Sequence, residues 1–247
     1  RLADLLPTTY DTRTLLPASL PSGCDVGRIM ELGKSPGLWI RELHRQGVTG
    51  AGVGIAIIDQ ALLVGHEEYR ERLRLYEEIH WVRGSPASMH GPAVASIAVG
   101  QSVGVAPGAD LYFIAEWHAN AAASDDVELD LTPLAQSIDR VVEINRMLPV
   151  GRKIRVVSIS LGINPSMAAH ELAMRAIDAA EREGIYTVFV GSDGFRGLGR
   201  DPLSDPERFE SYGVARSSLL WWKGTDDRKL YVPMDSRCTA APNGNAD

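Results

Sequence analysis

Four short, almost wholly apolar runs recur along the chain, at residues 53–58, 111–115, 155–160 and 186–190. Runs of this length and composition are typical of strands that are buried on both faces of a parallel sheet. Between these runs the apolar positions follow helical spacing, at residues 90–99, 132–147 and 167–182. Strands that alternate with helices predict a doubly wound α/β domain with a parallel sheet.

The segments outside this alternation predict less regular structure. Residues 1–35 contain several prolines and little periodicity, so we expect an irregular N-terminal arm. The apolar positions at the start of residues 36–247 follow helical spacing, and we expect this part of the chain to form a single domain of ordinary size. In the stretch 67–78, arginines alternate with glutamates, which is typical of a solvated helix face. The tail is rich in Pro, Gly and Asp and contains a strand-like piece at residues 230–232.

The charge and cysteine content exclude several classes of function. The 247 residues have a formal net charge of −7, which gives no long-range attraction for nucleic acid or anionic lipid, so we expect neither as a partner. No apolar run approaches the length of a membrane span, which is about 18 consecutive apolar residues. Cys24 and Cys238 are too few for a disulfide framework, although a single bridge between them stays open. The cellular compartment is not fixed by these features.

Two residues in this pattern are suited to acid–base chemistry. Asp59 ends the first buried run, and His90, followed by a glycine, begins a helix of small residues. Chemistry in parallel α/β sheets lies at the carboxyl ends of the strands, where Asp59 falls. An imidazole can take and return a proton near neutral pH, and a carboxylate on a rigid strand can hold its ring in one tautomer. The alternatives are that Asp59 is only a helix cap and that His90 is structural.

Five segments, read in order, resemble the subtilisin-like serine peptidases, the subtilase family. They are residues 55–69 (IAIIDQALLVGHEEY), 89–100 (MHGPAVASIAVG), 102–111 (SVGVAPGADL), 157–162 (VSISLG) and 187–194 (TVFVGSDG). The resemblance covers roughly residues 36–194. It implies a three-layer α/β/α fold and a serine endopeptidase that hydrolyses peptide bonds.

The resemblance also implies a role for individual residues. Asp59 would be the orienting acid and His90 the general base of an Asp-His-Ser triad. Ser192 would lie near the oxyanion hole. A substrate-binding strand would pair with an extended peptide through Ser160, Leu161 and Gly162.

The sequence departs from the family pattern at several positions. Gln60 and Ala61 follow the acid where the family has Ser or Thr and then Gly, and Pro92 and Ala93 follow His-Gly where it has Thr and another His. Ser192 stands where the family has Asn, and its shorter side chain predicts a weak oxyanion donor.

The largest departure concerns the nucleophile. The only partial match to the family's serine motif is residues 237–242 (RCTAAP), which has Cys238 at the serine position. The residues after it cannot form the long helix that the family motif begins. We therefore expect the nucleophilic serine to lie on a segment beyond Asp247, so that the peptidase domain is incomplete at its C-terminal end. Residues 1–247 alone should then hydrolyse peptides only weakly.

Other functions stay open beside this one. The chain could be an inactive subtilase-like binding or regulatory module, or Cys238 could be a nucleophile that pairs with His90. A metal site at His66 with Glu67 and Glu68 is the alternative to a structural His66.

Cofactors and partners follow from the same patterns. The glycines at 50, 52 and 54 precede a strand, whereas a dinucleotide fingerprint follows one. Residues 99–105 carry too few oxygen ligands for calcium. We therefore expect no metal and no cofactor. The expected partners are a peptide or protein substrate and the missing C-terminal segment, and the substrate preference is not fixed.

Overall fold

The computed structural model describes residues 2–5, 14–80, 87, 89–116, 129–190 and 197–215. Its helices are α1 (Leu2–Leu5), α2 (Val26–Gly33), α3 (Ile40–Arg45), α4 (His90–Val99), α5 (Thr132–Met147) and α6 (His170–Arg182), with short 3-10 turns at Val150–Arg152 and Phe209–Ser211. Its strands are β1 (Gly54–Asp59), β2 (Leu73–Ile79), β3 (Asp110–Glu116), β4 (Ile154–Gly162), β5 (Tyr186–Val190), β6 (Gly197–Arg200) and β7 (Tyr212–Ala215).

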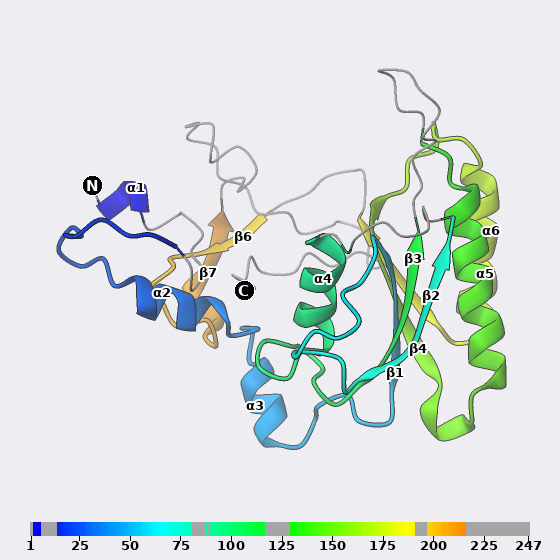
Figure 1. Ribbon diagram of the computed structural model, residues 1–247, viewed down its shortest axis with the longest axis horizontal. Helices are drawn as coiled ribbons and strands as arrows, with labels where there is room; N and C mark the ends of the chain where they lie inside the picture. Colours follow the sequence, from blue (N-terminus) through cyan, green and yellow to red (C-terminus); the bar gives the residue numbers. More distant parts are fainter. Residues whose placement is uncertain are drawn as a thin grey trace.

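A parallel sheet with the strand order β2-β3-β1-β4-β5 forms the centre of the fold. Helix α4 lies on one face of this sheet, and α5 and α6 lie on the other (Figure 1). The four apolar runs became β1, β3, β4 and β5, and the three helical patterns became α4, α5 and α6. The predicted doubly wound, three-layer α/β/α fold is therefore confirmed.

The packing of β1 decides which way its last residue faces. Ile57 packs with the cluster under α4, whereas Ile58 packs with the cluster under α5 and α6. Successive side chains of a strand point to opposite faces, so Asp59 shares the face of Ile57. The acid at the end of β1 is thus directed to the side of the sheet that carries α4.

The prediction of a solvated helix face in the stretch 67–78 is wrong: residues 67–72 form turns, and the chain then forms the edge strand β2. Its apolar residues, Leu73, Leu75 and Ile79, pack against the core clusters. Charged side chains are common on edge strands because they discourage pairing with a further chain. Arg74 on this strand forms an ion pair with Asp110 at the start of β3, with 2.6 Å between Nε and Oδ1.

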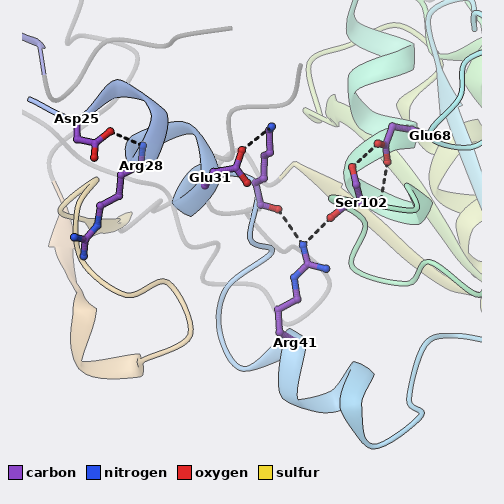
Figure 2. Close-up of polar contacts among 7 residues, drawn as sticks. Asp25, Arg28, Glu31, Arg41, Glu68 and Ser102 are labelled. Atoms are coloured by element: carbon purple, nitrogen blue, oxygen red, sulfur yellow. Dashed lines mark hydrogen bonds and ion pairs between the residues drawn. The ribbon is translucent and has the colours of Figure 1, made fainter. Parts of the chain in front are cut away.

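The N-terminal arm is more regular than expected, because residues 1–35 contain α1 and α2. Asp25 caps α2 by accepting a hydrogen bond of 2.9 Å from the backbone N–H of Arg28 (Figure 2). Val26 and Ile29 of α2 pack against Leu203, between β6 and β7. These two strands form an antiparallel hairpin that the sequence did not predict. The strand-like residues 230–232 lie outside the described residues, and within the described part no helix is long and apolar enough to cross a membrane.

An ion pair that joins α5 to β2 gives a prediction about acid stability. Arg140 donates to both carboxylate oxygens of Glu77 at 2.8 Å, and this hydrogen bonding lowers the pKa of Glu77 below its usual 4.5. A lowered native pKa stabilises the fold above the unfolded value, and this contribution is lost as the pH falls through the native pKa. Both side chains are about one-third exposed, so we expect a contribution of about 0.5–1 kcal/mol.

Urea unfolding at about pH 7 and about pH 3.5 gives the free energy of unfolding of the wild type and of Glu77→Gln. The gap between these two free energies measures the contribution of the ion pair at each pH. The variant should be less stable at the higher pH, and the gap should close at the lower pH. Glu181→Gln, at an exposed position of α6, serves as the control and should show no such gap. A gap that stays constant with pH would contradict the assignment.

Candidate active site

Asp59 and His90 lie in direct contact at the carboxyl end of β1. His90 Nδ1 is 2.6 Å from Asp59 Oδ1, so the contact predicted for these two residues is confirmed. The Asp59 side chain is only 2% exposed, whereas that of His90 is 50% exposed. The acid is thus buried behind the imidazole, and the ring reaches the surface.

The hydrogen bonds of Asp59 fix the tautomer of His90. Asp59 Oδ1 also accepts from the backbone N–H of Gln60 at 2.7 Å, which orients the carboxylate. An ionised carboxylate can only accept hydrogen bonds, so His90 Nδ1 is the donor. The neutral ring then has an unprotonated Nε2 that can accept a proton from a substrate or a nucleophile.

The start of α4 fits closely against the backbone that follows Asp59. A Cβ atom on Gly91 would lie 2.3 Å from the carbonyl oxygen of Gln60 and 3.0 Å from that of Ala61. Only a glycine allows this approach, which brings His90 to the end of β1. Pro92 lies in the first turn of α4, where a missing N–H costs the helix no hydrogen bond.

A small cavity of about 150 Å³ opens beside this pair. It is lined by Ile58, Asp59, Gln60, His90, Glu116, Ile159, Ser160 and Leu161. The family resemblance implies that Ser160, Leu161 and Gly162 form a substrate-binding strand, and the first two of these residues line the cavity. Gly162 pairs with Val190 instead.

The pairing of β4 changes just where it reaches the cavity. Its register with β1 runs to Ile159, and its register with β5 shifts between Ile159 and Gly162. Neither register includes Ser160 or Leu161, and Ser160 is exposed. This short stretch of strand is therefore suited to pairing with an added extended peptide.

Glu116 is a cavity residue that the sequence analysis missed. It ends β3, next to the strand that Asp59 ends, and it is only 3% exposed. The available signal was the same as for Asp59, an acid directly after a buried apolar run. Among the described residues that line the cavity, Asp59 and Glu116 each contribute a carboxyl group.

Other predicted residues lie apart from this site or outside the described part of the chain. Ser192 and Cys238 fall outside the described residues, so their relation to His90 stays a prediction. His66 stacks on Tyr69 with 5.1 Å between the ring centroids, and its Nδ1 accepts from the backbone N–H of Glu68 at 3.2 Å. Among the residues that the structure describes, no group of three or more His, Cys, Asp or Glu side chains could hold a metal ion.

Several solved structures are similar to this chain. The prenylagaramide maturation protease PagA is 18% identical with a TM-score of 0.46, over 61% of this chain and 50% of that one. The epidermin leader peptide processing serine protease EpiP from Staphylococcus aureus is 16% identical with a TM-score of 0.47, and the match covers 76% of this chain and 47% of that one. A cold-adapted subtilisin-like serine proteinase is 20% identical with a TM-score of 0.39, and the match covers 60% of this chain and 49% of that one.

A curated relative and a family model match the sequence itself. The subtilisin-like protease PopC of Myxococcus xanthus (strain DK1622) is 27% identical over 156 residues, which are 56% of this chain and 32% of that protein. The chain thus spans about a third of this relative and about half of the solved chains above. The model of the subtilase family matches residues 50–218, from the turn before β1 to beyond β7, and the chain therefore belongs to the subtilase family of peptidases.

Proposed function

We propose that this chain is part of a serine endopeptidase of the subtilisin type, with Asp59 as the orienting acid and His90 as the general base. The observation that carries the proposal is the 2.6 Å contact between a buried carboxylate and a half-exposed imidazole at the edge of a cavity. Its nucleophile is a serine outside residues 1–247, since the sequence holds only the partial motif at 237–242.

The proposed mechanism follows from the tautomer of His90. Its Nε2 takes the proton of the serine hydroxyl while the serine oxygen attacks the carbonyl carbon of the peptide bond. The imidazolium that forms is stabilised by Asp59, and it gives the proton to the leaving amine as the C–N bond breaks. A water molecule then repeats the two steps on the acyl-enzyme, which releases the acid and restores the serine.

The proposed substrate is an extended peptide or protein segment. It pairs with the backbone of Ser160, Leu161 and Gly162 as an added strand, which is supported by the register shift in β4. Ser192 then lies near the oxygen of the scissile carbonyl. We propose Ser192 as a weak donor there, because a hydroxyl is shorter than the carboxamide found in the family.

Labelling with a serine-directed phosphonate probe tests the proposal. We expect the complete protein to be labelled at a serine beyond Asp247 and the label to be lost in His90→Ala. Residues 1–247 alone should not be labelled, because the serine hydroxyl that attacks the phosphorus of the probe is outside them. Mass spectrometry of the labelled peptide identifies the site.

Three other outcomes separate the alternatives. Absence of label in the complete protein would indicate an inactive binding or regulatory module. Rapid alkylation of Cys238 that depends on His90 would indicate a thiol nucleophile. Phosphonate on a serine within residues 1–247 would overturn the proposed place of the nucleophile.

A further inference from the structure

The loop after α4 is attached to the segment after β1 by hydrogen bonds to Glu68. Glu68 Oε2 accepts from the backbone N–H of Ser102 at 2.9 Å, and Glu68 Oε1 accepts from the Ser102 hydroxyl (Figure 2). The backbone carbonyl of Glu68 also accepts from the N–H of Gln101 at 3.0 Å. We refer to the bonds between the Glu68 carboxylate and Ser102 as the Glu68–Ser102 clamp.

Glu68 is itself held on a rigid stretch of chain. The next residue, Tyr69, is fully buried, and its hydroxyl donates to the carbonyl of Leu63 at 2.9 Å. His66 stacks on Tyr69 and accepts from the N–H of Glu68. The clamp is therefore anchored to the segment that directly follows Asp59 and the end of β1.

The loop side of the clamp is equally constrained. A Cβ atom on Gly100 would lie 2.6 Å from Glu68 Oε2, so the close approach of the carboxylate depends on a glycine at the end of α4. On the other side, Arg41 of α3 donates to the carbonyl of Ser102 at 2.6 Å (Figure 2). Ser102 is thus held through its N–H, its hydroxyl and its carbonyl.

The clamp and the catalytic pair hold the two ends of one helix. His90 is the first residue of α4, Gly100 directly follows its last residue, Val99, and Ser102 is the third residue after Val99. The ten-residue helix is about 15 Å long, and its backbone hydrogen bonds connect the two ends. Both Asp59 and Glu68 belong to β1 and the segment after it, so α4 is fixed to the same stretch of chain at both ends.

We propose that Glu68 is a positioning residue for His90, which it holds in register with Asp59 through Ser102 and α4. This inference rests on the proposed role of His90 as the general base. A catalytic hydrogen bond tolerates displacements of only about 0.5 Å, and a displacement of about 1 Å costs on the order of 10²-fold in rate. The proposed substrate strand belongs to β4, whereas the clamp joins the segment after β1 to the loop after α4, so we expect the affinity for peptide not to depend on Glu68.

Kinetics of the complete protein on fluorescently labelled casein test the inference. Glu68→Ala should lower kcat about 10- to 100-fold and change KM by less than about 3-fold. Glu68→Gln keeps an oxygen acceptor for Ser102 and should recover most of this loss. The matched control is Glu67→Ala, which removes the same side chain from the exposed neighbouring position and should leave kcat unchanged.

Ser102→Ala is a second variant that keeps the test valid if Glu68→Ala folds poorly, and together the two variants form a double-mutant cycle. Ser102→Ala removes only the hydroxyl donor and should lower kcat by about 3- to 10-fold, and Glu68→Ala should add less in this background than in the wild type. The low-field proton resonance of His90 Nδ1 should shift or broaden in Glu68→Ala and not in Glu67→Ala. A purely structural role would lower the melting temperature and leave this resonance and kcat unchanged.

The outcomes distinguish this inference from the proposed function. If His90→Ala is inactive and Glu68→Ala keeps kcat within about 2-fold, the positioning role is wrong and the proposed function stands. If His90→Ala keeps full activity, the proposed function is wrong and this inference is wrong with it. Additive effects of Glu68→Ala and Ser102→Ala on kcat would also overturn the clamp.

Discussion

Replacing Asp59 with asparagine is expected to lower the kcat of the complete protein about 10⁴-fold, which is the loss that this exchange causes in another serine peptidase with the same triad. The carboxamide of asparagine can donate a hydrogen bond to His90 Nδ1, which the ionised carboxylate cannot do. The ring then carries its proton on Nε2 and cannot take the proton of the nucleophile. Because the exchange nearly preserves side-chain size, KM should change far less than kcat.

Casein hydrolysis measures the loss in kcat, and thermal unfolding shows that the variant is folded. Asp139→Asn is the matched control, since Asp139 is exposed on α5, on the opposite face of the sheet from His90. This control should keep the wild-type kcat. A kcat for Asp59→Asn within about 10-fold of the wild type would remove Asp59 from the mechanism.

The parts of the fold that were predictable are those that one local pattern determines. A continuous apolar run such as residues 111–115 is compatible with burial on both faces, and β3 is buried along its whole length. The edge strand β2 has one neighbour and keeps charged side chains beside its apolar ones. Its pattern was therefore assigned to a helix, because charge alternation alone does not separate the two structures.

Only those residues of the candidate site that lie at the ends of strands or helices were predictable. Asp59 ends a strand and His90 begins a helix, so their meeting at one edge followed from the topology. The contact between Glu68 and Ser102 was not predictable, because it forms through the packing of a loop on another segment. In sequence Glu68 is only one member of an acidic run.

The approach of α4 to β1 also depends on a contact that no local pattern encodes. Gly91 is the second residue of α4, and an added Cβ would lie 2.3 Å from the carbonyl oxygen of Gln60. The atom that it would meet belongs to the backbone next to Asp59, so it cannot move aside as a flexible side chain would. Any larger residue must push the start of α4, and His90 with it, away from Asp59.

Gly91→Ala is therefore expected to lower kcat/KM about 10²-fold or more, although alanine is the better helix former. The overpacked contact should also reduce the free energy of unfolding by about 1–3 kcal/mol. Gly65→Ala is the matched control, because within the described part of the chain no atom beyond its two chain neighbours lies within 4 Å of the added Cβ. It should change the free energy of unfolding by less than about 0.5 kcal/mol. Casein hydrolysis and urea unfolding of both variants measure the two effects. Wild-type activity in a folded Gly91→Ala protein would show that His90 does not need its close approach to β1.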